Sequence, residues 1–331
     1  MVRHVRKSAP KLCHRVSVTV PVTVAVSKGP CLTMRCAIGV FFFAIRASAP
    51  VSANLILWNN TGKLARFPAL AGNPLVPWLQ ERAWDEHARL VHKETVLLKT
   101  YHRYLQKLRG RQVRVLELGI QSGGSLEMWL NYFGEGAHAY GCDIEPRVKE
   151  YASERVTVFV GDMGDPRFLH RVRTSIPQPI DFVLDDASHI SWHQKLAFEM
   201  IFPYVNPDGG VYMVEDLQKN YAAQSPWNAG LHSEGSFVAF AKKKIDELHG
   251  KIICQERNVP QAHCKEAHTN FTRTTTGIHV HQNIIVFEKS PNPDSMQFKS
   301  GRLIIPKKTS GFMGLTEAKS RKIRDEDSTL Q

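Results

Sequence analysis

Runs of β-branched and other apolar residues alternate with amphipathic segments through the middle of the chain. The apolar runs are short enough for buried strands, and the segments between them repeat apolar residues at helical spacing. Strands are predicted at Val113–Leu118, Ala137–Asp143, Val156–Val160, Ile180–Leu184 and Val211–Val214. Helices are predicted near Ser125–Phe133, Pro166–Thr174, Trp192–Val205 and Gly235–His249. Because strands and helices alternate over short connections, the pattern predicts an α/β fold with a mostly parallel sheet and helices on both faces.

Two further patterns flank this alternating region. Ile278–His281 and Ile284–Glu288, which Gln282-Asn283 separates, predict an antiparallel pair that closes the sheet. Upstream, apolar and aromatic residues recur at helical spacing from Glu81 to Leu108, so we expect one or two amphipathic helices there. The whole region is long enough for one domain with a full core, which we place at residues 81–290.

The charge of the chain is distributed unevenly. Its formal net charge is +12, but residues 1–80 contain ten Lys and Arg and no acid. The remaining residues carry 33 basic and 31 acidic side chains and are close to neutral at +2. We therefore predict a basic leader at 1–80, the domain at 81–290, and a largely disordered extension at 291–331. A nearly neutral domain without a basic patch gives no electrostatic reason to expect a nucleic-acid partner.

The leader has features of a targeting segment. The apolar run Cys36–Ile45 is too short to span a bilayer, which needs roughly 20 residues, but it has the length of a signal-peptide core. Ala47-Ser48-Ala49 supplies a small-residue cleavage pattern after it. We expect entry into the secretory pathway from Met34 or import into an organelle, the alternative being a cytoplasmic protein with an over-extended start. A Cys254–Cys264 disulfide and two glycosylation sequons would fit the secretory route.

A glycine-rich turn follows the first predicted strand. Glu117, Gly119 and Gly123 lie where the strand passes into a helix, and Ser125 opens that helix. Glycines allow a ligand to approach the backbone, and a helix start offers free N–H groups. The segment lacks the G-x-G-x-x-G pattern of dinucleotide-binding folds, since Glu117 stands where the first glycine would be. An acid at this place favours a cationic ligand without pyrophosphate, such as S-adenosylmethionine.

The next two strands support a nucleoside ligand. Asp143 ends the second strand, where a carboxylate can accept both ribose hydroxyls of an adenosine. Asp162 follows the third strand and is a candidate for the adenine edge. Each acid alone is equally well explained as a helix cap, but the three features occur in order at successive strand ends. We therefore predict an S-adenosylmethionine site.

Four carboxylates come from the ends of the next two strands. Asp185-Asp186 and Glu215-Asp216 should meet at the carboxyl edge of the sheet, where ligand sites of α/β folds lie. Like charges so close together raise one another's pKa unless a cation joins them, and Mg²⁺ prefers oxygen ligands. Helix capping is the alternative for each pair. His189 follows closely enough to take a proton from a hydroxyl that a metal has acidified.

The sequence resembles the macrolide-sugar O-methyltransferase family. The resemblance lies in Asp185–His189, in the segment Phe202–Gly210 and in Tyr212–Asp216, and it extends from about Tyr101 to Lys289. It implies a Rossmann-like class I methyltransferase fold with an antiparallel closing strand. This chain shows no counterpart of the family's long N-terminal auxiliary region, so neither the substrate nor the oligomeric state follows from the resemblance.

The same resemblance implies a role for each site residue. Asp186, Glu215 and Asp216 would hold Mg²⁺, His189 would be the general base, and Asp185 we assign to the cofactor side of the site. We therefore expect an enzyme that moves the methyl group of S-adenosylmethionine to a hydroxyl of a small molecule, in the first place a sugar or glycosylated natural product. The alternatives are a nicotinamide-dependent oxidoreductase and a non-catalytic S-adenosylmethionine-binding protein.

Overall fold

The computed structural model describes residues 56–58, 64–66, 70, 72–83, 85–222, 233–253, 264, 269–293, 298 and 300–301, which all belong to one unit, Ser52–Gln331. The predicted targeting segment, the first sequon, Cys254 and most of the predicted C-terminal extension lie outside these residues. Cys264 is disulfide-bonded, and its predicted pairing with Cys254 stays a prediction. Within the described ranges, no helix combines the length and the apolar character needed to cross a membrane.

A seven-stranded sheet forms the centre of the fold, in the order β5-β4-β3-β6-β7-β9-β8. Its strands are β3 (Val113–Leu118), β4 (Ala137–Asp143), β5 (Val156–Val160), β6 (Phe182–Asp185), β7 (Val211–Glu215), β8 (Thr275–His281) and β9 (Ile284–Lys289). β3 to β7 pair in parallel, and β9 runs antiparallel to both β7 and β8. The predicted α/β class, the parallel core and the antiparallel closing pair are confirmed, and the topology is Rossmann-like.

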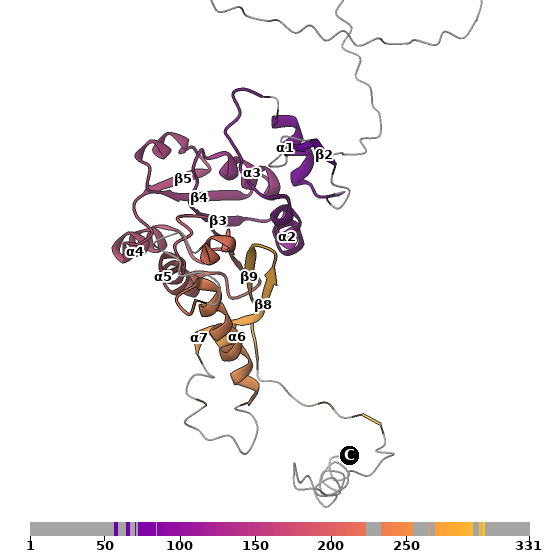
Figure 1. The fold of residues 1–331 in the computed structure, drawn as a ribbon, viewed down its shortest axis with the longest axis vertical. Helices are drawn as coiled ribbons and strands as arrows, with labels where there is room; N and C mark the ends of the chain where they lie inside the picture. Colours follow the sequence, from indigo (N-terminus) through magenta and orange to yellow (C-terminus); the bar gives the residue numbers. More distant parts are fainter. Residues whose placement is uncertain are drawn as a thin grey trace, which may run out of the picture. The chain divides into compact units, whose positions relative to one another are not determined.

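Helices cover both faces of this sheet (Figure 1). Alternate strand residues point to opposite faces, and Val115 packs with α1 (Leu75–Arg82), α2 (Thr95–Leu105) and α3 (Gly124–Phe133). The next residue, Leu116, packs with α4 (Pro166–Ser175), α5 (Ser191–Ile201) and α6 (Phe237–Ile253). The remaining elements are β1 (Ile56–Trp58), β2 (Leu64–Arg66), α7 (Asn270–Thr274) and short 3-10 turns at Gln106–Leu108, Pro146–Tyr151, Phe202–Tyr204 and Leu217–Tyr221.

Several predicted elements differ from the observed ones: the helix expected at Gly235–His249 is α6 at Phe237–Ile253, and the strand expected at Ile180–Leu184 is β6 at Phe182–Asp185. α5 ends at Ile201 rather than at residue 205, because Pro203 has no N–H to continue the helix and a 3-10 turn follows. Helix was expected from residue 81 to 108, but α1 ends at Arg82 and α2 begins only at Thr95. Asp85 accepts a hydrogen bond from the His87 N–H in the intervening segment, a local turn that competes with helix. The packed core also begins before residue 81, since Leu75 belongs to it.

The non-helical residues 85–94, which we call the 85–94 segment, cross the start of α3. A Cβ atom at Gly124 would lie 2.4 Å from the Leu90 carbonyl oxygen and 2.6 Å from that of Arg89. Arg89 also stacks over the ring of Tyr151 and forms an ion pair with Glu127 of α3 at 3.4 Å. The segment is therefore held closely against the helix that begins after the glycine-rich turn.

Gly124→Ala tests this packing. The new methyl group meets backbone atoms that no side-chain rotation can move, so we expect a loss of stability of about 1–3 kcal/mol. Gly250→Ala is the matched control, because a Cβ at Gly250 in α6 meets nothing within 4 Å and gains helix propensity of up to about 1 kcal/mol. Urea unfolding midpoints measure both changes, and equal stability of the two variants would contradict the close contact.

Candidate active site

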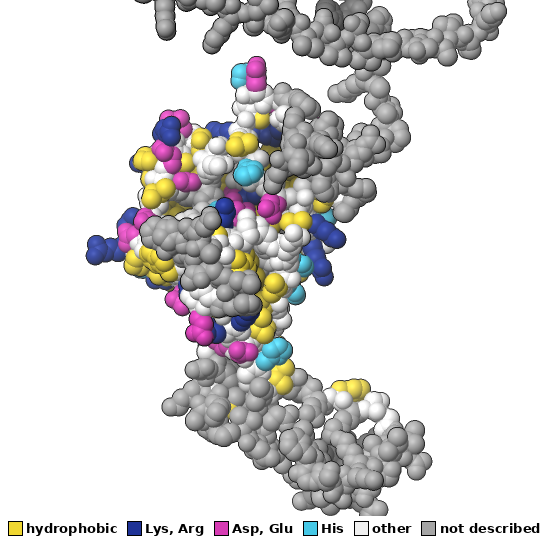
Figure 2. Space-filling model, viewed as in Figure 1, with side chains coloured by type: hydrophobic (Ala, Val, Ile, Leu, Met, Phe, Trp, Pro, Cys, Tyr) yellow, Lys and Arg dark blue, Asp and Glu magenta, His cyan; other side chains and the backbone are white. Residues whose placement is uncertain are grey.

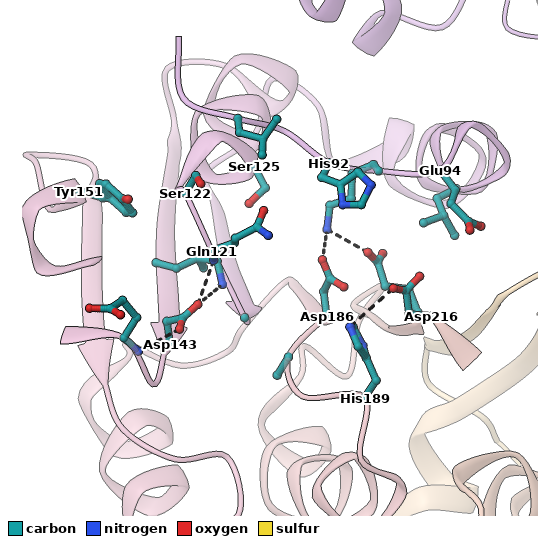
Figure 3. Close-up of a pocket in the computed structure, with 18 of the residues that line it drawn as sticks. His92, Glu94, Gln121, Ser122, Ser125, Asp143, Tyr151, Asp186, His189 and Asp216 are labelled. Carbon is teal, nitrogen blue, oxygen red and sulfur yellow. Dashed lines mark hydrogen bonds and ion pairs between the residues drawn. The ribbon is translucent and has the colours of Figure 1, made fainter. Parts of the chain in front are cut away.

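A cavity of about 860 Å³ opens at the carboxyl edge of β3, β4, β6 and β7 (Figure 3). Its lining includes the glycine-rich turn on one side and the residues that follow β6 and β7 on the other. The 85–94 segment supplies a third wall through Leu90, His92, Lys93 and Glu94. The cavity therefore lies where ligand sites of open α/β sheets are found.

Backbone conformation and close contacts account for the first two glycines of the turn. Gly119 has φ +85°, and a Cβ there would lie 2.3 Å from the Asp186 carbonyl oxygen. Gly123 has φ +73°, and a Cβ there would meet the Tyr151 ring at 2.5 Å. Both positions need glycine for conformation and for space. The turn following β3 is thus packed directly against the loop that carries Asp186.

Asp143 organises the same turn from the neighbouring strand. Its Oδ2 accepts hydrogen bonds from the N–H groups of Ile120 at 3.0 Å and Gln121 at 2.9 Å, and its Oδ1 accepts one from Glu145 N–H at 3.0 Å. The carboxylate still faces the cavity, as Figure 3 shows. Asp143 is therefore placed to shape the turn and to contact a ligand with the lone pairs that remain.

Lys93 enters the group of carboxylates from the 85–94 segment. Its Nζ donates to Asp186 Oδ2 at 2.5 Å, to Glu215 Oε1 at 2.9 Å and to Glu117 Oε1 at 3.3 Å. The Lys93 side chain is only 4% exposed, and those of Glu117 and Glu215 are buried as completely. The sequence predicted a cation for the group that contains Asp186 and Glu215, and a cationic ligand for Glu117, but it did not identify Lys93. We call the four residues the Lys93 cluster.

Burial and charge act in opposite directions on the pKa values of this cluster. Burial raises the pKa of Glu215 to about 8 and that of Asp186 to about 6, although the Lys93 ammonium lowers both. Burial also raises the pKa of Glu117. Burial alone would lower the pKa of Lys93, but the charges of Glu215, Glu117 and Asp186 together hold it well above its ordinary value. The ammonium is therefore the charged partner that offsets part of the effect of burial on these carboxylates.

Two aromatic residues donate further hydrogen bonds to the buried acids. The Tyr101 hydroxyl of α2 donates to Glu215 Oε2, and the Trp129 indole of α3 donates to Glu117 Oε2 at 3.1 Å. Both oxygens of Glu215 are thus engaged, one by Lys93 and one by Tyr101. From the sequence, Tyr101 is assigned only to the apolar face of a helix. Helical spacing indicates which face a residue lies on, but it does not indicate which residue its hydroxyl bonds.

His189 and Asp216 lie next to each other on one side of the cavity (Figure 3). His189 Nε2 lies 3.6 Å from Asp216 Oδ2, and His189 Nδ1 is buried without a hydrogen-bond partner among the described residues. Burial lowers the pKa of His189 below its ordinary 6.5, although the charges of Asp216 and Glu215 oppose this. The imidazole is therefore neutral at pH 7 and able to accept a proton.

The backbone at the cavity is strained. Among the described residues, four that are not glycine have positive φ: Gln121, His189, Asp216 and Asn283. The first three line the cavity, and Asn283 donates through Nδ2 to Asp216 Oδ1 at 3.2 Å. Left-handed conformations of such residues cost free energy and gather at functional sites. This clustering is independent support for the cavity as the site of chemistry.

Asp186, His189 and Asp216 form a group that could hold a metal ion. One ligand atom from each lies within 4.8 Å of the others, and the unpaired His189 Nδ1 shows that this group lacks a full set of partners. Two carboxylates suit a hard divalent cation such as Mg²⁺, which keeps several positions for water or substrate. Glu215 is next to this group but is turned toward Lys93 and Tyr101. The residues present therefore fit a divalent ion.

The other predicted site residues take different places. Ser125 lines the cavity, and its hydroxyl hydrogen-bonds Glu117, which lies buried behind the wall. Asp162 is outside the lining and accepts from Gly164 N–H at 2.8 Å. Asp185 is buried outside the lining, its pKa is raised to about 7 by burial, and its Oδ2 has no partner within the described part of the chain. The structure thus brings the acids after β6 and β7 together, except that Asp185 faces the core.

Comparison with known proteins gives a consistent picture. Residues 88–209 match the FtsJ-like methyltransferase family. A tetracenomycin rhamnosyl 2'-O-methyltransferase of Streptomyces olivaceus is 36% identical over 58% of this chain and 50% of its own length. Mycinamicin VI 2''-O-methyltransferase of Micromonospora griseorubida is 32% identical over 59% of this chain and 48% of its own length. The chain spans about half the length of these relatives.

A solved structure shows the same fold. The MycE methyltransferase of the mycinamycin biosynthetic pathway, in complex with Mg and SAH, is 29% identical with a TM-score of 0.55. The similarity covers 66% of this chain and 55% of that one. Residues 88–209 therefore resemble an FtsJ-like methyltransferase domain, and the fold is the class I, Rossmann-like methyltransferase fold. Its relatives include sugar O-methyltransferases of natural-product pathways, and the resemblance expected from the sequence motifs is confirmed.

Tyr101→Phe tests how much the hydrogen bond from the Tyr101 hydroxyl to Glu215 stabilises the metal-free protein. The change leaves one oxygen of a buried carboxylate without its donor, and we expect a loss of about 1.5–3 kcal/mol, as for hydrogen bonds to charged groups. Tyr104→Phe on the same helix is the control, since it loses only a neutral hydrogen bond to His281 Nε2 and should cost about 1 kcal/mol. Chemical denaturation compares them, and a Tyr101→Phe loss no larger than the control would contradict this role.

Proposed function

We propose that this chain is a Mg²⁺-dependent O-methyltransferase that moves the methyl group of S-adenosylmethionine to a hydroxyl of a sugar or glycosylated natural product. One observation carries the proposal. A single cavity joins a nucleoside-type turn, Gly119–Ser125 with Asp143, to the acid and histidine group Asp186, His189 and Asp216. The relatives named as sugar O-methyltransferases and the related structure with Mg and SAH support the same assignment.

The nucleoside side of the cavity would hold S-adenosylmethionine. Gly119 and Gly123 let the turn pack closely against Asp186 and Tyr151, and α3 begins beside the turn with free N–H groups. Asp143 is fixed by three backbone N–H groups and keeps lone pairs for ribose hydroxyls. Arg147, Glu150 and Tyr151 close the far end of the cavity. These residues thus form a preformed binding surface for a cofactor that carries an activated methyl group.

The acidic side would hold the metal and the acceptor hydroxyl. Asp186 and Asp216 are the residues whose carboxylates are placed for the ion, with Glu215 next to them. A bound divalent cation would supply Lewis acidity that lowers the pKa of the acceptor hydroxyl. His189 is neutral and lies beside Asp216, so its imidazole can take the proton from that hydroxyl. The residues on both sides then act by positioning the reactants in one enclosed space.

The alternatives have less support. A nicotinamide oxidoreductase would need a pyrophosphate-binding turn, and the turn here has Glu117 in place of its first glycine. A non-catalytic binding protein does not explain why strained backbone gathers at His189 and Asp216. A polyanionic substrate is not favoured, because basic and acidic side chains are interspersed on the face seen in Figure 2.

A methyl-transfer screen tests the proposal. Labelled S-adenosylmethionine is incubated with the full chain and a panel of free sugars, glycosides and catechols, with Mg²⁺ and with EDTA. We expect transfer to a hydroxyl of a sugar-bearing compound that EDTA abolishes. Binding of S-adenosylmethionine and NAD is measured in parallel, and preferential NAD binding without methyl transfer would overturn the proposal.

His189→Ala should abolish methyl transfer and leave the affinity for S-adenosylmethionine near that of the wild type, since His189 lies on the acidic side of the cavity. The wild-type rate should fall as the pH drops below about 6.5, because protonation removes the basic form and burial lowers the pKa of His189. Single-turnover rates measure both effects. Full turnover by the His189→Ala enzyme would contradict the assignment of His189 as the general base.

Asp143→Ala should weaken binding of S-adenosylhomocysteine by at least about tenfold, since the turn loses its acceptor and the ribose loses a partner. Asp165→Ala is the matched control, because Asp165 Oδ1 accepts from Arg167 N–H at the start of α4, away from the cavity. The control should lose stability but keep cofactor affinity in isothermal titration. Equal affinities of the two variants would show that Asp143 does not serve the cofactor.

A further inference from the structure

The Lys93 ammonium lies where two of the expected metal ligands meet. Asp186 and Glu215 are among the three residues that the sequence motifs assign to Mg²⁺, and Lys93 Nζ bonds one oxygen of each. Lys93, Asp186 and Glu215 all line the same cavity. A lysine and a divalent cation therefore compete for the same oxygen atoms.

Electrostatic repulsion makes it unfavourable for Lys93 and a divalent cation to bind Asp186 and Glu215 at the same time. An ammonium and a divalent cation bonded to the same two carboxylates would stand within a few ångströms of each other, with strong repulsion in a buried site. Glu215 is a particular obstacle, because Tyr101 already holds its other oxygen. For Glu215 to act as a metal ligand beside Asp186, its oxygen facing Lys93 has to become free.

We propose that Lys93 is an exchangeable counter-ion of this site: it neutralises Asp186 and Glu215 in the metal-free protein and withdraws from both when a divalent cation binds. This inference rests on the metal site of the proposed function. Lys93 is a positioning residue in this scheme and touches no substrate. Its stem is long and unbranched, so the ammonium can leave by side-chain rotation.

The surroundings allow the ammonium to move while the backbone stays. Glu117 Oε1 lies 3.3 Å from Nζ, which is the longest of the three contacts, and Glu117 keeps the Trp129 indole as a donor when the ammonium leaves. Glu94, the next residue, accepts at Oε2 from Asn283 Nδ2 at 2.9 Å, and Asn283 also donates to Asp216. Arg89 and Leu90, in the middle of the segment, are packed against Gly124. The backbone is thus held on both sides of Lys93, and only the lysine side chain needs to exchange.

Metal affinity gives the first test. Isothermal titration of MgCl₂ is compared for the wild type, Lys93→Met and Lys99→Met, all without cofactor. Lys99 is exposed on α2, so its variant loses the same charge outside the cluster. We expect Lys93→Met to bind Mg²⁺ at least about tenfold more tightly than the wild type, because a competing charge is removed. Lys99→Met should match the wild type. Equal or weaker binding by Lys93→Met overturns the proposal.

Amine labelling of the wild type gives a second test that does not depend on the folding of a variant. Acetylation by an amine-reactive ester, read by mass spectrometry, reports how accessible each lysine is with and without MgCl₂. Lys93 should be protected in the metal-free protein and become severalfold more reactive with Mg²⁺, while Lys99 stays unchanged as the internal control. Unchanged protection of Lys93 at saturating Mg²⁺ overturns the proposal, even if the variant binds more tightly.

The two experiments separate this inference from the proposed function. If the wild type transfers methyl groups in a Mg²⁺-dependent manner and Lys93 stays protected, the exchange is wrong and the function stands. If neither the wild type nor Lys93→Met binds Mg²⁺, the exchange fails together with the metal assignment. Binding of S-adenosylhomocysteine, measured in the same samples, then reports on the cofactor side alone.

Discussion

The buried ion group around Lys93 is the interaction on which the site depends. Glu117, Asp186 and Glu215 come from the ends of three parallel strands, and removing their charges from water is costly unless a cation and hydrogen-bond donors compensate. Lys93, Tyr101 and Trp129 provide that compensation from elements that precede or cover the sheet. The same contacts hold the 85–94 segment over the cavity. The residues that compensate the buried charges therefore also shape the cavity.

Strain is concentrated where the sheet supports it. β3, β6 and β7 are buried on both faces and form a rigid base, whereas His189 and Asp216 adopt left-handed backbone conformations in the loops that follow β6 and β7. Such conformations persist only where the surrounding structure fixes them. Asn283, from the turn between β8 and β9, donates to Asp216. The antiparallel closing strands therefore contribute to the site as well as to the edge of the sheet.

Hydrophobic periodicity predicted the sheet well because the strands are buried on both faces and bounded by turns. β3, β4 and β5 begin and end at the predicted residues. Prediction failed where tertiary contacts outweigh a helical pattern. Residues 85–94 lie within the stretch 81–108 that has apolar residues at helical spacing, yet they are not helical, and Gly124 and Glu127 of α3 contact them. No local period contains that information, since the partners lie about 35 residues away.

The sequence by itself determined that several acids and a histidine gather at one edge, because the carboxyl ends of neighbouring parallel strands must meet there. It also determined that so many negative charges require a cation. Only the tertiary structure decided that the chain supplies one itself, through Lys93, and that Asp185 turns to the core while Asp186 faces the cavity. The reason is physical: burial and ion pairing depend on which distant elements pack together, and a residue's type and spacing do not specify its distant partners.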